Sequence, residues 1–154
     1  MVYRICGLRR RQFEALFAAG DEELRQRGAR RVIADGPGYP CRVSLEEAAQ
    51  GEQLILTNFV SHDVAGPFRT AYAIYLREAA AEGPDYADAV PPLLDRRTLG
   101  LRGFDAEGML KGALLAAPGE ADVRIRQLLA DPDIASIHAH NAAHGCFLAR
   151  VERD

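Results

Sequence analysis

Cysteine, histidine and arginine recur in three separated segments of the chain, and these residue types bind anions and carry thiol chemistry. The first segment is Pro40-Cys41-Arg42, the second surrounds His62, and the third runs from His138 to Cys146. A guanidinium can hold a carboxylate or phosphate through two hydrogen bonds, and a thiol becomes nucleophilic beside a base or a cation. These three segments are therefore the candidates for a functional site.

The C-terminal segment carries two histidines, His138 and His140, at a spacing that a metal site could use. On a strand both imidazoles would point to one face, opposite Ile137 and Ala139. Further ligands would have to come from Cys146, His144, His62 or Cys41. The sequence has no close cysteine pair and no His-Glu-x-x-His motif, so we expect neither a metal nor a cofactor. The alternative is that both histidines lie on a half-exposed face, hydrogen-bonded or solvated.

Cys146 follows a predicted turn that begins after His140. If the last two strands pair as a hairpin, Cys146 starts the return strand close to His140, and Asn141 could orient an imidazole. A cysteine-dependent enzyme would then use Cys146 as nucleophile or redox thiol and His140 as its base. The simpler alternative is that Cys146 is a small hydrophobic residue buried where a strand begins.

The Pro-Cys-Arg segment favours a different function, the binding of a small anionic molecule. An extended backbone there could present the Arg42 guanidinium to a ligand. We expect a polar cleft that collects residues from all three segments. Its expected ligand-binding residues are Cys41, Arg42, His62, Arg77 and Asn141, beside the catalytic candidates Cys146 and His140. Alternatively, Cys41 packs in the core and Arg42 pairs with a surface carboxylate such as Glu46. A third possibility is a structural or interaction protein without a ligand site.

Composition limits the classes of partner. The 154 residues suit one domain, over residues 1–154, and 48% hydrophobic with 27% charged residues are ordinary values for a globular protein. A net charge of -3 disfavours nucleic acid, and no apolar stretch approaches the roughly 20 residues of a membrane span. Three sparse cysteines favour a reducing compartment, the cytoplasm. The expected partners are a small anionic molecule and, for the chain itself, a second copy in a homodimer.

The pattern of apolar residues predicts an α+β fold, a single domain with a mostly antiparallel sheet and a few short helices packed on it. Strands are predicted at residues 2–6, 31–34, 52–60, 72–78, 98–104, 109–115, 134–140 and 146–152, and helices at 13–17, 21–27 and 123–131. Ser44 and Glu47 form a capping-box pattern that predicts another short helix through Ala49. Residues 61–69, which include His62, are expected to form a polar loop.

Four motifs occur in an order that resembles a known family. They are Tyr39-Pro-Cys-Arg-Val-Ser-Leu45, the His62 segment with Pro67-Phe68-Arg69, Ile74-Tyr-Leu-Arg-Glu78, and His140-Asn141-x-x-x-Gly145-Cys146. Together they resemble, nearly end to end, a bacterial family catalogued as domain of unknown function 1203. The resemblance implies a small cytosolic single-domain protein and supplies no catalytic residues. It gives His140, Asn141 and Cys146 more weight than His144, which lies in the predicted turn.

Overall fold

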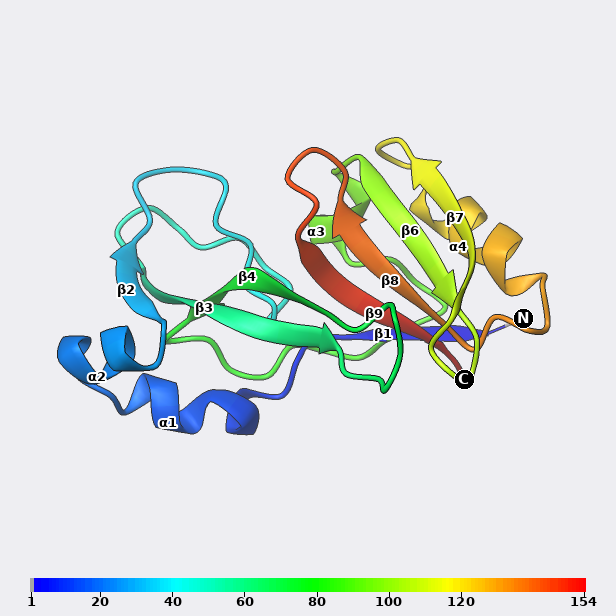
Figure 1. Ribbon diagram of the computed structural model, residues 1–154. Helices are drawn as coiled ribbons and strands as arrows, with labels where there is room; N and C mark the ends of the chain where they lie inside the picture. The colour runs from blue at the N-terminus through cyan, green and yellow to red at the C-terminus, as the bar shows by residue number, and fades with distance from the viewer. Residues whose placement is uncertain (1) are drawn as a thin grey trace.

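Two antiparallel sheets make up the computed structural model, which describes residues 2–154 (Figure 1). The larger sheet has the strand order β5-β1-β9-β8-β6-β7, and the smaller one has the order β2-β3-β4. The strands are β1 (Tyr3–Cys6), β2 (Arg30–Ile33), β3 (Gln53–His62), β4 (Thr70–Arg77), β5 (Tyr86–Ala87), β6 (Leu99–Phe104), β7 (Leu110–Ala116), β8 (Ser136–Asn141) and β9 (Phe147–Arg153). The helices are α1 (Glu14–Phe17), which extends a 3-10 turn at Arg10–Phe13, α2 (Asp21–Gln26), α3 (Pro92–Asp95) and α4 (Ala121–Leu129).

The larger sheet buries one face against α3 and α4. Side chains alternate along a strand, so Ile137 and Ala139 of β8 enter this core while their neighbours face the other way. Helix α4 contributes Ile125 and Leu129, which are spaced to lie on one face and are fully buried. Burying each such side chain stabilises the fold by about 2 kcal/mol. This core fixes the position of β8, whose opposite face carries His138 and His140.

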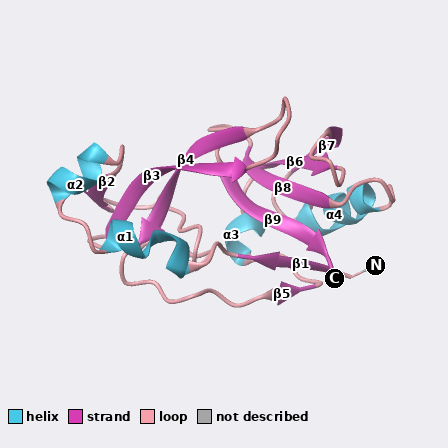
Figure 2. Ribbon diagram, turned by 60° about the horizontal axis from the view of Figure 1, so that its bottom comes forward, coloured by secondary structure: helices cyan, strands magenta, loops and turns pink. Residues whose placement is uncertain are grey.

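The smaller sheet is covered on its two faces by different segments. On one face Ile55 and Leu76, which are paired across β3 and β4, pack toward the N-terminal helices (Figure 2). On the other face Leu54 and Tyr75 meet the long loop that connects β2 to β3. That loop, residues 34–52, is held by an isolated antiparallel bridge between Pro40 and Glu47 and by a parallel bridge between Cys41 and Tyr75. The loop also contacts the larger sheet, because Leu45 enters its core and Arg42 donates to the Phe147 carbonyl of β9.

The two sheets meet in a layer of aromatic and imidazole rings, which we call the histidine layer. Its members are His62, Tyr72, Phe104, His138, His140 and Phe147. The ring centroids of His62 and Phe104 are 4.1 Å apart, and those of Tyr72 and His140 are 5.1 Å apart. Strands β3 and β4 thus cross the histidine-bearing face of the larger sheet and bury it.

The predicted fold class is confirmed, two local predictions are wrong, and the sequence does not predict two short elements, β5 and α3. Residues 44–49 form no helix: Leu45 has φ 54°, and its amide donates to the Cys41 carbonyl, so the chain turns back to pair with itself. Strand β3 continues past Val60 through a bulge, so His62 ends a strand and is buried. Helix α3 spans only four residues, too few to show an apolar periodicity in the sequence.

No helix within residues 2–154 is long and apolar enough to cross a membrane.

Candidate functional site

A cleft of about 410 Å³ lies between the smaller sheet and the turn that joins β8 to β9. We call it the Arg42 cleft. Its lining residues are Gly38, Pro40, Arg42, Leu56, Ala73, Tyr75, Arg97, Asn141, His144 and Cys146. None of them is acidic. The volume falls within the roughly 300–1,000 Å³ that small-molecule sites occupy, and the mixture of apolar walls with a few polar groups is typical of such sites.

Strands β3 and β4 supply the apolar wall of the cleft. Leu56 and Tyr75 are paired across the two strands, and Ala73 is two residues from Tyr75 on the same face. The tilted packing of Tyr75 against Tyr39, with ring centroids 5.0 Å apart, holds the Tyr75 ring in place. The small side chain of Ala73 leaves the space that a larger residue would fill.

The turn between β8 and β9 supplies the polar wall. The Asn141 side-chain oxygen accepts hydrogen bonds from the backbone amides of Ala143 and His144, at 3.1 and 3.3 Å. Gly145 has φ 77°, a conformation that other residues rarely adopt, and it lets the chain return to β9. This geometry places His144 and Cys146 at the cleft and leaves the side-chain amide of Asn141 without a further contact to the turn.

Arg42 is the most unusual residue of the cleft, because its charge is buried without a carboxylate. The side chain is 2% exposed. Its Nε donates to the Phe147 carbonyl at 2.8 Å and its Nη1 to the Pro40 carbonyl at 2.6 Å, while its Nη2 lies 3.3 Å from the Cys146 Sγ. These contacts use three of the five N–H groups of a guanidinium. Burial lowers the pKa of Arg42, although an arginine remains charged.

A second guanidinium, Arg97, also lines the cleft. It follows α3, donates to the Leu93 carbonyl and forms an ion pair with Glu47. Its charge acts on Arg42, since Arg97 is among the groups that lower the Arg42 pKa. Two arginines and one carboxylate at the margin leave the cleft with a net positive charge.

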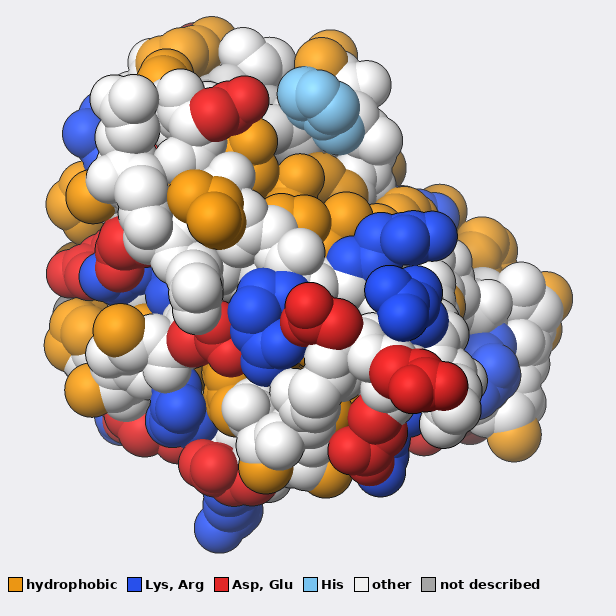
Figure 3. All heavy atoms as spheres, turned by 90° about the vertical axis from the view of Figure 1, so that its left-hand side faces the viewer, with side chains coloured by type: hydrophobic (Ala, Val, Ile, Leu, Met, Phe, Trp, Pro, Cys, Tyr) orange, Lys and Arg blue, Asp and Glu red, His pale blue; other side chains and the backbone are white. Residues whose placement is uncertain are grey.

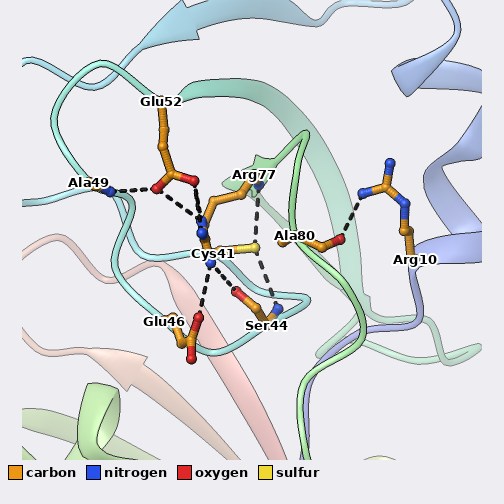
Figure 4. Close-up of polar contacts among 8 residues, drawn as sticks. All are labelled: Arg10, Cys41, Ser44, Glu46, Ala49, Glu52, Arg77 and Ala80. Atoms are coloured by element: carbon orange, nitrogen blue, oxygen red, sulfur yellow. Dashed lines mark hydrogen bonds and ion pairs between the residues drawn. The ribbon is translucent and has the colours of Figure 1, made fainter.

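Cys41 and Arg77 lie together in a different place, where two carboxylates compensate the Arg77 guanidinium (Figure 4). The Arg77 guanidinium contacts Glu52 at 2.8 Å and Glu46 at 3.0 Å. Cys41 is fully buried, and its Sγ accepts hydrogen bonds from the backbone amides of Ser44 and Arg77. Glu46 is thus the partner of Arg77, and the alternative that paired it with Arg42 is wrong.

The histidines of the layer are buried rather than half-exposed. His62 Nε2 lies 3.0 Å from the Gly108 carbonyl, and His140 Nδ1 lies 3.0 Å from the Gly145 carbonyl. Both ring nitrogens of His138 and Nε2 of His140 are buried without a hydrogen-bond partner. Burial, with the nearby His62 second, lowers the pKa of His138 to about 3, and burial also lowers the pKa of His140.

The described residues contain no group of three or more histidine, cysteine or acidic side chains arranged to hold a metal ion. Three imidazoles nevertheless approach one another in the histidine layer: His138 is 4.9 Å from His62 and 6.4 Å from His140, between ring centroids. Each is turned toward an aromatic ring or a carbonyl rather than toward a common point. The layer therefore packs the two sheets against each other.

The structure brings three of the predicted site residues, Arg42, Asn141 and Cys146, to one cleft. The others lie elsewhere. Cys41 and Arg77 form the compensated contact, His62 lines a separate cavity beside β3, and His140 packs behind the turn.

Three polar side chains that line the cleft, those of Tyr75, Arg97 and His144, are not among the predicted site residues. The sequence places His144 in a turn and Tyr75 in a strand. Arg97 carries no sequence signal that separates it from its neighbour Arg96, which is exposed and lies outside the cleft. Only the path of the chain after α3 distinguishes them.

The fold and the cleft define a small α+β domain with a basic site between two antiparallel sheets. The chain belongs to the family described as protein of unknown function DUF1203, whose model matches residues 38–153. Every lining residue of the Arg42 cleft falls within that match. No curated protein and no solved structure gives a significant match.

Proposed function

We propose that the protein binds a small anionic molecule in the Arg42 cleft. The observation that carries this proposal is the buried Arg42 guanidinium without a carboxylate partner. Removing a charge from water is costly, and a buried charge is normally compensated by an opposite one. Backbone carbonyls compensate Arg42 in part. An anion that accepts from its remaining N–H groups would complete the compensation.

The cleft also supports a ligand of a particular shape. Leu56, Ala73 and the Tyr75 ring form an apolar wall opposite the arginines. A molecule with a carboxylate or phosphate at one end and a short apolar body would contact both walls. Arg97, at the cleft margin, would bind either a second anionic group of the ligand or the same group that Arg42 binds.

The charge distribution favours a small ion over a polyanion. The chain has a net charge of -3, and acidic and basic side chains are interspersed over the surface that Figure 3 shows. A nucleic acid requires an extended basic track that neutralises many phosphates. A local positive cleft on an acidic protein instead attracts one small anion.

Titration calorimetry tests the proposal with two probes, inorganic phosphate and octanedioate, an eight-carbon dicarboxylate. We expect the wild-type protein to bind at least one of them, and Arg97→Gln to weaken that binding at least tenfold, since a charge-assisted hydrogen bond is worth about 1.5–3 kcal/mol. Arg96→Gln is the matched control and should bind as the wild type does. Absence of binding for both probes, or equal loss in the two variants, would reject an anion site in this cleft.

A second function, cysteine-dependent catalysis, is favoured by the position of Cys146 on the cleft wall. His140, the predicted base, contacts the Gly145 carbonyl, whereas the histidine that lines the cleft is His144. Repeated turnover of the 4-nitrophenyl monoester of succinate, abolished in Cys146→Ser, would support this function. Release of at most one nitrophenolate per chain would argue against it.

A further inference from the structure

We propose that Cys146 is a thiol–disulfide exchange site that selects small disulfides carrying carboxylates. This inference rests on the proposed anion binding and names the chemistry of its ligand. Three observations support it: the position of the sulfur, the absence of a second thiol in the cleft, and the contrast with the other two cysteines.

The sulfur lies where a bound anion would bring a reactive group. Cys146 is partly exposed on the cleft wall, and its Sγ is 3.3 Å from Arg42 Nη2. An anion held by the free N–H groups of that guanidinium is a neighbour of the sulfur. A disulfide two or three bonds away from its own carboxylate would therefore reach the Sγ while its charge stays on Arg42. Such positioning raises the effective concentration of the reacting group.

The exchange needs no oxidant beyond the disulfide itself. The deprotonated Cys146 Sγ attacks one sulfur of R–S–S–R, and a bond forms between these two sulfurs as the original S–S bond breaks. The other half leaves as RS⁻ and takes a proton from solvent. Cys146 is oxidised to a mixed disulfide, and the departing half is reduced to a thiol. A free thiol in excess reverses the reaction.

The mixed disulfide would persist, because the cleft holds no second cysteine. Cys41 and Cys6 are free thiols outside the cleft lining, and Cys41 is fully buried among backbone amides. No resolving thiol of the chain therefore displaces the bound half. The structure thus favours a reversible mixed disulfide at Cys146 over a disulfide between two cysteines of the chain.

Cys6 provides a control within the same molecule. It is also partly exposed, but it lies beside Asp85, which is paired with Arg4 and Arg9. Burial, and then the hydrogen bond with Asp85, raise the pKa of Cys6 to about 11. This environment supplies no unpaired cation, so Cys6 should react slowly and without preference for anionic reagents.

The experiment uses three disulfides of similar length and different charge: 3,3′-dithiodipropionate, bis(2-hydroxyethyl) disulfide and cystamine. Rates of mixed-disulfide formation at Cys146 and Cys6 are measured by peptide mass spectrometry, and each is divided by the rate of N-acetylcysteinamide with the same reagent. This division removes the intrinsic reactivity of each disulfide. At Cys146 we expect the dicarboxylate to be favoured over cystamine at least tenfold, an ordinary effect of a charged cleft, with no comparable preference at Cys6.

The variants Arg97→Gln and Arg96→Gln show whether the cleft causes the preference. Arg97→Gln should reduce the preference for the dicarboxylate several-fold, and Arg96→Gln should leave it unchanged. Equal normalised rates for the three reagents at Cys146, or a preference that Arg97→Gln leaves undiminished, would overturn the inference.

Binding of octanedioate, the carbon isostere of dithiodipropionate, separates this inference from the proposed function. Its affinity for Cys146→Ser is measured by calorimetry. If octanedioate binds that variant while Cys146 of the wild type shows no selectivity, only the exchange inference fails. If octanedioate and phosphate both fail to bind and the selectivity is also absent, the proposed anion site fails with it.

Discussion

Two cysteine–arginine contacts occur in this chain, and they differ in what surrounds the arginine. In the first, the Cys41 sulfur accepts from the Arg77 backbone amide, and the Arg77 guanidinium is paired with two carboxylates. In the second, the Cys146 sulfur lies against the Arg42 guanidinium, which contacts only carbonyls besides. The first contact is closed, and its cation is fully paired. The second is open and positive, and for that reason it is the candidate site.

The contrast arises within two consecutive residues. Cys41 and Arg42 are adjacent, and on an extended backbone adjacent side chains point in opposite directions. Cys41 therefore turns toward Ser44 and Arg77, while Arg42 turns toward β9 and Phe147. A single Cys-Arg dipeptide thus contributes one residue to a structural contact and one to a cleft.

The sharpest test of this contrast is the reactivity of the two thiols toward iodoacetamide, a neutral reagent. Cys146 is partly exposed, whereas Cys41 is fully buried and reacts only after the structure opens. An opening free energy of about 4 kcal/mol or more gives a rate ratio of at least roughly a thousand. Peptide mass spectrometry of a time course measures both sites. Comparable rates under native conditions would show that the contact around Cys41 is not closed.

A smaller effect, on the free energy of unfolding with and without a bound anion, should distinguish Arg42 from Arg77. Arg42→Met should lower the free energy of unfolding by about 3 kcal/mol, because the Phe147 and Pro40 carbonyls lose their donor. A probe anion at a hundred times its Kd should stabilise the wild type by about 2.7 kcal/mol, and this gain should be absent in Arg42→Met.

Arg77→Met serves as the matched variant for this test. It should also be destabilised, but it should keep the gain from octanedioate or phosphate in urea denaturation, because Arg77 lies outside the cleft. If both variants keep the gain, or both lose it, the two arginines do not differ as the structure indicates.

The sequence is sufficient for the fold class and for eight of the nine strands found within residues 2–154, because hydrophobic alternation records which face of a strand is buried. The hairpin of β6 and β7 and the pairing of β8 with β9 were both predictable. The placement of Ile137 and Ala139 opposite His138 and His140 follows from the same alternation, and the structure confirms it. Such information is local to each strand.

The grouping of side chains into sites was predictable only in part, because it depends on how the two sheets are placed. The sequence assigns His62 to a polar loop, since nothing in it shows the partner sheet; in the structure His62 ends β3 and is buried against Phe104. Glu46 and Glu52 converge on Arg77 rather than Arg42 through the path of the β2–β3 loop. Charge compensation is a tertiary property, and a dipeptide motif does not encode it.

Acid should affect the Arg42 side of the molecule before the Arg77 side. His138 lies in the histidine layer with Phe147, whose carbonyl accepts from Arg42. Its pKa is lowered to about 3 in the folded state from 6.5, so the unfolded chain binds the proton more tightly. The stability from neutral His138 is present above pH 6.5 and is lost as pH falls toward 3. The charges that face it, from Arg102 and Arg150, act in the same direction as burial.

The variant His138→Leu, in which the side chain has a similar volume, measures how much the neutral His138 contributes to stability. Relative to it, the wild type should lose about 1.4 kcal/mol per pH unit below pH 6.5, or about 2 kcal/mol by pH 5. His144→Leu, at an exposed position, is the control and should show the wild-type pH dependence. Parallel stability curves for the wild type and His138→Leu in urea titrations would contradict the assignment.

The smallest expected effect on stability concerns the ion pair between Arg77 and Glu52, in the contact around Cys41. The hydrogen bonds from Arg77 lower the pKa of Glu52 below 4.5, so its stabilisation is present above that pH and is lost as pH falls through the lowered value. Glu52→Gln should therefore cost about 0.5–1 kcal/mol at pH 7, the range of a partly exposed ion pair, and less at pH 3. Denaturation at the two pH values measures this difference, and a cost that is equal at both would exclude an ionic origin. Replacing a carboxylate of the chain cannot produce such a pH-dependent loss at Arg42, because this cation has no acidic partner among residues 2–154. Only an added anion can supply an acidic partner for Arg42.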